Sequence, residues 1–188
     1  VPLREALSLV HNTLVGLNLR QHIRIGAAGK ITTAFDIART LALGADWCNA
    51  ARGYMFSLGC IQSLSCHTDR CPTGVATQNQ GRQKALVPAD KATRVHQFHE
   101  NTMMALRDLI AAAGLTHPDE LGPEHIIRRV SSTKVRSLSR LLPFIQPGAL
   151  LADTVPDHPV FQAFWADSRS DSFAAPALVR AMRSSKIR

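Results

Sequence analysis

The spacing of apolar positions changes from helical to extended within the first thirty residues. From Leu3 to Leu17 apolar residues recur at three- and four-residue steps, which predicts one face of an amphipathic helix. Asn18 is well placed to end this helix, because Asn tolerates the left-handed conformation that is common just past a helix. The β-branched stretch over residues 23–29 runs into glycine, so it predicts a strand with its exit loop.

The next twenty residues repeat the same order of elements. Thr33 and Asp36 resemble a capping box with Asp in place of the usual Glu or Gln, and the helix they open is predicted to run through Ala42 and stop at Gly44. Residues 46–50 predict a second strand. This alternation indicates an α/β protein with a parallel sheet. Because two strands cannot cover their own faces and edges, we expect the chain to be a fragment whose other strands lie elsewhere.

Helical patterns dominate beyond residue 80. A long helix is predicted with Asp90 as its cap and Gly114 at its end. Short helices are predicted to start at Pro118 and Pro123, since proline suits the first helical position, and another helix is predicted over residues 133–142.

The organisation predicted along the chain has three parts. An α/β part that includes the clustered cysteines is expected over residues 1–80, and a helical extension of the same domain over residues 81–151. From residue 146 onward Pro, Asp and Ser accumulate, so residues 152–188 are expected to form an irregular or disordered tail.

The net charge of +8 comes from 22 Lys and Arg against 14 Asp and Glu, and the excess falls mostly late in the chain. A basic excess can serve a polyanionic partner, but only 5% of the residues are aromatic, so platforms for stacking bases are few. We therefore interpret the cations as a solvated face and expect no nucleic-acid partner. No apolar run approaches the roughly 20 residues of a membrane-spanning helix, and we expect a cytoplasmic protein without a membrane segment here.

Three of the four cysteines fall within twelve residues. Cys60, Cys66 and Cys71 have the spacing C-x5-C-x4-C, with Pro72 directly after the last. Iron–sulfur clusters are held by thiolates from short loops, often with a Cys-Pro junction. Three thiolates in one loop match a 3Fe–4S cluster, for which Arg70 could offset charge.

Two other interpretations of these cysteines stay open from spacing alone. Zinc could take the three thiolates with His67, although the C-x2-C pairs typical of zinc sites are missing and His67 adjoins Cys66. The thiols could also be buried without any ligand. Cys48 falls on the second predicted strand, where a small core residue is the favoured interpretation.

Three consecutive tracts together resemble the flavin-binding domain of glutamate synthase. They are residues 25–44, residues 45–59 and the cysteine loop, which continues as Cys71-Pro72-Thr73-Gly74-Val75-Ala76-Thr77-Gln78. The last tract is close to the family's cluster loop, including Cys66-His67-Thr68. The chain is more similar to stand-alone glutamate-synthase-like flavoproteins than to the long multidomain enzyme, because no β-helical repeat follows the barrel part.

The resemblance implies the C-terminal fragment of a (β/α)8 TIM barrel, comprising its last two strands, followed by the cysteine loop and a mostly helical region. It assigns Cys60, Cys66 and Cys71 to a 3Fe–4S cluster. It also implies FMN, with the phosphate near the loops after these strands; the positions concerned are Gly29, Lys30, Ala51 and Arg52. The family's Asp-Gly-Gly is Ala28-Gly29-Lys30 here, so an acidic residue and a second glycine are lost.

The activity implied by the resemblance is reduction of 2-iminoglutarate, formed from 2-oxoglutarate and ammonia or glutamine, to L-glutamate. Electrons would come from an NADPH-linked subunit or ferredoxin. A related flavoprotein acting on another substrate and a zinc-stabilised basic module are the alternatives. Catalytic residues are expected on the missing strands, since His11 and His67 are better interpreted as structural or surface residues.

Overall fold

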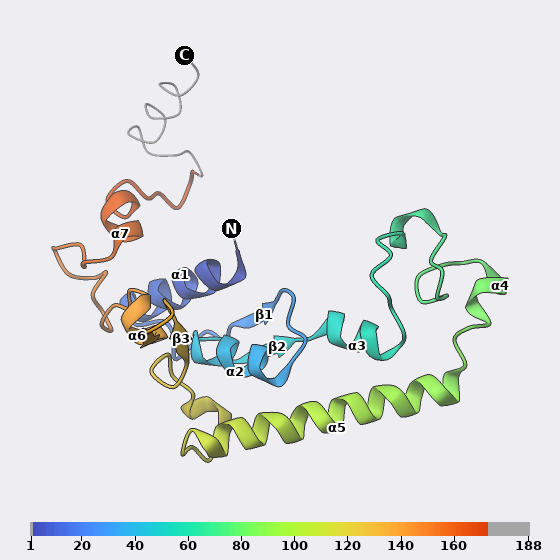
Figure 1. Cartoon of the computed structure of the whole chain (residues 1–188). Coiled ribbons are helices and arrows are strands. Elements are labelled where there is room, and N and C mark those ends of the chain that lie inside the picture. Colours follow the sequence, from blue (N-terminus) through green and yellow to red (C-terminus); the bar gives the residue numbers. More distant parts are fainter. Residues whose placement is uncertain (1, 173–188) are drawn as a thin grey trace.

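The computed structural model describes residues 2–172 and places short helices and small sheets along one long helix (Figure 1). The α-helices are α1 (Leu3–Gly16), α2 (Ala34–Ala42), α3 (Ala51–Ser57), α4 (Gln80–Gln83), α5 (Pro88–Ala112), α6 (Leu138–Leu141) and α7 (Pro159–Phe164). The strands are β1 (Gly26–Ala28), β2 (Trp47–Asn49), β3 (Ile127–Arg129) and β4 (Val135–Ser137), and the 3₁₀ turns are η1 (Cys66–Thr68) and η2 (Pro118–Glu120). The α/β class expected from the sequence is confirmed.

The ends of α1 and α2 form as the sequence predicts. Asn18 follows α1 with a φ of 55°, in the left-handed region. At the start of α2, Thr33 and Asp36 make both hydrogen bonds of a capping box. Gly44 follows α2 with a φ of 106°, a conformation that favours glycine.

The first sheet consists of β1 and β2, which pair in parallel as predicted, with Ala27 opposite Cys48. Each strand has three residues and is shorter than the sequence indicated. Asp46 fixes the approach to β2, because its carboxylate pairs with Arg20 at 2.8 Å and accepts a hydrogen bond from the backbone N–H of Ile25 at 2.6 Å. Ala27 is buried within the main core, whereas Gly26 and Trp47 are exposed.

The long helix α5 runs beneath α2 and α3 and packs against both (Figure 1). The helix starts at Pro88, two residues before the predicted cap Asp90. Proline suits the first turn, because backbone N–H groups there have no partner within the helix. Leu106 and Ile110 are buried in the core, and Gly114 follows the helix with a φ of 76°. No helix among residues 2–172 combines the length and apolar character needed to cross a membrane.

Two helices predicted from the sequence are wrong. Residues 133–142 form β4 and the single turn α6, and β4 pairs antiparallel with β3. Pro118 does begin η2, but Pro123 begins a turn in which Gly122 and His125 bond to one another. Pairing with β3 makes residues 135–137 a strand. Strand preference depends on cross-strand and packing contacts, which a local sequence pattern does not contain.

The chain after β4 returns to α1 and forms a second small core. Ile145, Leu150 and Phe161 are buried there. The expectation of an irregular tail over residues 152–188 is wrong for residues 159–164, which form the helix α7. Phe161 packs this helix into the second core. The same expectation for residues 173–188 lies outside the described residues.

Candidate functional site

A cavity of about 420 Å³ lies where the ends of β1 and β2 meet the cysteine loop. We call it the strand-end cavity. The residues lining it that the sequence singled out are Gly29, Lys30, Ala51, Arg52, Cys60 and Cys66. Thus all four residues expected at a phosphate and two of the three clustered cysteines face one space, although the two groups come from different segments.

The wall of the cavity after β1 is built by a tight turn. Gly29 has a φ of 153°, and a Cβ at this position would lie 3.3 Å from the side chain of Leu3. Glycine is therefore favoured by backbone conformation and by space. Such a turn lets a ligand approach the backbone closely, as a phosphate requires.

The wall after β2 is the start of α3. Ala50 caps this helix without a side-chain hydrogen bond, so no side chain competes for the first N–H groups of α3. Ala51 is small, and Arg52 is exposed and adds a positive charge beside these N–H groups. Backbone donors with an adjacent guanidinium suit an oxyanion.

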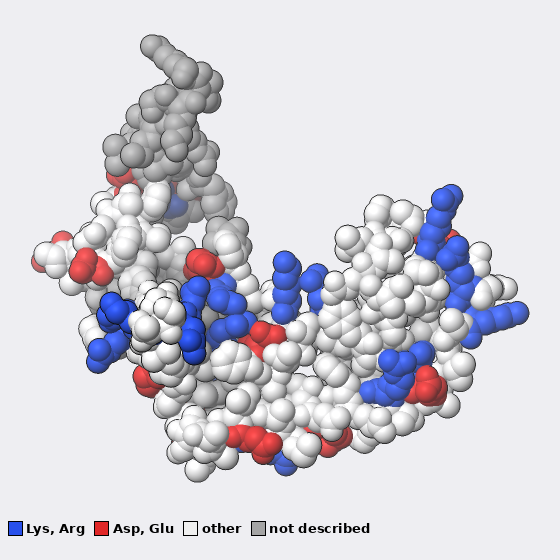
Figure 2. All heavy atoms as spheres, in the orientation of Figure 1, with Lys and Arg blue, Asp and Glu red and all other residues white. Residues whose placement is uncertain are grey.

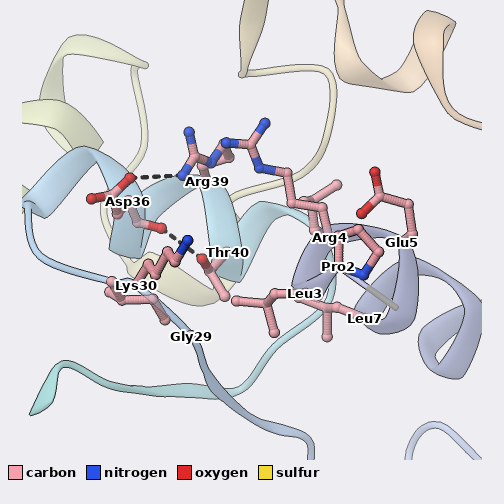
Figure 3. A pocket seen from close by; sticks show the side chains of 12 residues that line it. Pro2, Leu3, Arg4, Glu5, Leu7, Gly29, Lys30, Asp36, Arg39 and Thr40 are labelled. Atoms are coloured by element: carbon pink, nitrogen blue, oxygen red, sulfur yellow. Dashed lines mark hydrogen bonds and ion pairs between the residues drawn. The ribbon is translucent and has the colours of Figure 1, made fainter. Parts of the chain in front are cut away.

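Lys30 lies between two cavities. It lines the strand-end cavity and also a second cavity of about 490 Å³ between α1 and α2. Figure 3 shows its side chain extending into this second cavity, toward Thr40 and Asp36. Its ammonium group is therefore directed toward α2.

The three clustered cysteines differ in exposure. Cys60 is half-buried, Cys66 is exposed on η1, and Cys71 is buried at 5% exposure. All three are free thiols. Within residues 2–172, no three His, Cys, Asp or Glu side chains are grouped closely enough to hold a metal ion. The loop thus supplies three soft donors that do not form a closed ligand set in this structure.

Cys71 occupies an environment that favours its thiolate. Its sulfur lies 3.5 Å from the hydroxyl of Thr73. Hydrogen bonds from Thr73, then from the backbone of Ala76 and its neighbours, lower the pKa of Cys71 to about 7. The thiolate is the form of cysteine that acts as a nucleophile or binds a metal, so this environment makes Cys71 a readily ionised thiol.

Two residues that the sequence did not single out hold the loop in shape. The carboxylate of Asp69 accepts hydrogen bonds from the hydroxyl of Thr77 and the N–H of Gln78. Arg82 donates to the carbonyl oxygens of Arg70 and Cys71 at 3.3 and 3.4 Å. Asp69 has a φ of 61°, in the left-handed region. An Asp in a loop is the sequence signal that could have indicated this role, because its side chain commonly accepts hydrogen bonds from nearby backbone N–H groups.

The remaining cysteine and the two histidines behave as structural or surface residues. Cys48 is half-buried on β2, and burial raises the pKa of its thiol to about 11. His67 is exposed next to Cys66. His11 accepts a hydrogen bond from Arg20 at 3.3 Å, and burial, followed by the charge of Arg20, lowers its pKa.

Comparison with known proteins assigns the family. Residues 1–116 match the model of the conserved region in glutamate synthase, which includes the strand-end cavity and the cysteine loop. The chain therefore belongs to the glutamate synthase family.

Several curated relatives are similar to this chain. The glutamate synthase large subunit-like protein YerD of Bacillus subtilis is 41% identical over 142 residues, which is 76% of this chain and 27% of that protein. The archaeal NADPH glutamate synthase of Methanocaldococcus jannaschii is 32% identical over 64% of this chain and 24% of its own length. The ferredoxin-dependent glutamate synthase of Antithamnion is 31% identical over 64% of this chain and 8% of its own length. The chain thus spans about a quarter or less of these relatives.

Proposed function

We propose that this chain forms the flavin-phosphate and iron–sulfur end of a glutamate-synthase-like oxidoreductase. In this proposal β1 and β2 are the last two strands of a (β/α)8 barrel, whose active site lies at the C-terminal ends of its strands. The strand-end cavity carries the proposal, because it brings the turn at Gly29 and the start of α3 with Arg52 together with Cys60 and Cys66 of the cluster loop.

The residues of the cavity fit the phosphate of FMN. Gly29 gives room for close backbone approach, Ala51 keeps the start of α3 open, and Arg52 contributes charge. Lys30 would add charge from the side of α2. These groups would bind and orient the cofactor and leave its ring free to face the remaining strands.

The sulfur donors fit an iron–sulfur cluster by their chemistry. Cys60, Cys66 and Cys71 would hold a 3Fe–4S cluster, with Thr73 and nearby N–H groups keeping Cys71 deprotonated. Because these donors are not grouped in the described structure, we expect cluster binding to draw the loop together, as metal binding commonly orders its ligands. When bound, FMN and the cluster supply the redox chemistry that reduces 2-iminoglutarate, from 2-oxoglutarate and ammonia or glutamine, to L-glutamate.

Two electron donors and two substrates are candidates. Relatives named for NADPH and for ferredoxin support either an NADPH-linked subunit or ferredoxin as the donor. A related flavoprotein acting on another substrate is the second candidate function. The loop Ala28-Gly29-Lys30 favours it, because the family's acidic residue is absent there.

The test uses the complete protein, purified without oxygen. Replacing Cys60, Cys66 or Cys71 by serine is expected to remove iron and acid-labile sulfide, whereas Cys48→Ser, which changes a thiol outside the loop, retains both. Retention of iron in every loop variant would contradict the cluster assignment, and zinc without sulfide would favour the zinc module.

The flavin and the substrate are tested separately. Arg52→Gln is expected to weaken FMN binding about tenfold, while the exposed Arg94→Gln leaves it unchanged. Glutamate formation from 2-oxoglutarate, ammonia and a reduced donor supports the first candidate. Protein that holds FMN and cluster but forms no glutamate under these conditions would favour the second.

A further inference from the structure

Two adjoining cavities lie between the start of α1, α2 and the β3–β4 hairpin, and the larger of them also shares Gly29, Lys30 and Ile31 with the strand-end cavity. Their volumes are about 490 and 450 Å³. Arg4, Glu5, Arg39 and Leu43 line both, so the two form one continuous groove, which we call the arginine groove. The 450 Å³ part shares no lining residue with the strand-end cavity.

The centre of the arginine groove holds two guanidinium groups. Figure 3 shows Arg4 and Arg39 extending toward one another from α1 and α2, with Glu5 on the far side of Arg4 from Arg39. Arg39 is paired with Asp36 at 2.7 Å on its other side, whereas Arg4 has no ion-pair partner within residues 2–172. Two facing cations without a carboxylate between them repel one another unless an anion bridges them.

Further cations border the 450 Å³ part from the hairpin. Arg128 and Arg129 line it beside Arg4 and Arg39, and Glu5 is the one acidic residue among its described lining. Lys and Arg side chains gather around β3 on the visible face (Figure 2). The charge of this part of the groove is therefore complementary to an anion.

The floor of the same part is apolar. Leu43 and Leu138 are 1% and 6% exposed, while Val130, at the rim, is 43% exposed. An apolar floor with a few convergent charged groups is the usual composition of a small-molecule site, and the volume falls within the range of such sites.

We propose that the arginine groove binds a small amphipathic anion, with a carboxylate or phosphate head between Arg4 and Arg39 and an apolar body on the floor near Val130. This inference does not depend on the flavin or on the cluster. It assigns a ligand site between α1, α2 and the β3–β4 hairpin.

The test measures binding to the complete protein by titration calorimetry with octanoate and octyl phosphate, each below its micelle-forming concentration. We expect saturable one-to-one binding of at least one of them, and the stronger ligand identifies the head group. Arg4→Gln is expected to weaken this binding by about tenfold or more, whereas Arg94→Gln, which changes an exposed arginine of α5, leaves it unchanged. Arg128→Gln serves as a second variant if Arg4→Gln lowers the melting temperature.

The apolar half of the site has its own controls. Val130→Ser is expected to weaken octanoate and octyl phosphate binding, and Val135→Ser, an exposed valine outside the groove, is not. Octanol or inorganic phosphate binding as tightly as the octyl anions would overturn the proposal. Equal effects of Arg4→Gln and Arg94→Gln on octanoate or octyl phosphate binding would also overturn it. So would a protein that binds anionic vesicles but neither octanoate nor octyl phosphate.

Discussion

At the scale of single residues, Asp36 connects the loop after β1 to α2. Its carboxylate accepts hydrogen bonds from the backbone N–H and hydroxyl groups of Thr32 and Thr33 and pairs with Arg39. Burial by itself raises the pKa of Asp36, but the hydrogen bonds from Thr33 and Thr32 together outweigh it, so the pKa lies below its ordinary value.

Asp36 should therefore make α2 sensitive to acid. A carboxyl whose folded-state pKa is lowered contributes stability above its unfolded pKa and loses it as the pH falls through the folded value. We expect Asp36→Asn to lower the protection of α2 amides at neutral pH by about 1 kcal/mol. It should also flatten the further loss of protection at acid pH, below the ordinary carboxyl pKa of about 4. Hydrogen exchange measures both, and equal pH slopes in the two proteins would contradict the assignment.

Gly26 is required by the ring of Trp47. A Cβ on Gly26 would lie 2.5 Å from the indole ring across the β1–β2 pair. Gly26→Ala is expected to destabilise the protein by about 1–3 kcal/mol, because the ring or a strand must move. In a double-mutant cycle measured by denaturant unfolding, Trp47→Ala should remove most of this cost. Gly81→Ala, whose Cβ would lie 3.2 Å from the side-chain oxygen of Asn79, is the control. Additive effects of Gly26→Ala and Trp47→Ala would refute the clash.

At the scale of elements, Asn12 ties the C-terminal segment to α1. It is 1% exposed, donates to the carbonyl of Pro143 at 3.0 Å and accepts from the N–H of Ile145 at 3.2 Å. A Cβ on Gly16 would lie 2.6 Å from Ile145 and Leu150, so the segment also fits closely against the end of α1.

Asn12→Ala should loosen this segment while α1 persists. It leaves the carbonyl of Pro143 and the N–H of Ile145 without these partners, which costs about 1–3 kcal/mol for a buried polar group. We expect faster proteolysis within residues 143–165. Asn101→Ala, at an exposed position of α5, is the matched control, and equal cleavage rates in both variants would show that Asn12 does not hold the segment.

At the scale of the whole molecule, apolar side chains remain uncovered at several sites. Trp47 is 49% exposed, Phe35 45%, and Leu64 in the cysteine loop 82%. Trp47 lies on the exposed side of the β1–β2 pair, whereas Ala27 faces the core. A sheet with one open apolar face requires a cover, which the remaining strands of the proposed barrel would supply.

The 188-residue chain purified alone is therefore expected to aggregate or to remain partly unfolded. Light scattering and binding of a dye specific for exposed apolar surface would detect both states. The complete protein serves as the comparison. Sharp, cooperative melting of the isolated chain as a monomer would contradict this prediction.

Local sequence patterns predicted correctly the features whose physical cause is local. The capping box of Thr33 and Asp36 and the glycine ends of α2 and α5 depend on residues within a turn of each other, and the sequence predicted them correctly. The spacing of the three cysteines likewise predicted one soft-donor loop, and the assignment of a cluster to it stays a prediction. These features follow from residue type and short separation alone.

Tertiary structure decided the features that join distant segments. The strand pairing of residues 135–137 with residues 127–129 overrode the helical pattern, because cross-strand contacts outweigh weak local preference. The strand-end cavity and the arginine groove each draw side chains from separate elements, and the local sequence around Lys30 did not indicate that its side chain extends toward α2. The sequence by itself thus determined the helix caps and the close spacing of the three cysteines, whereas packing decided which side chains face a common space, because only a folded chain brings remote residues together.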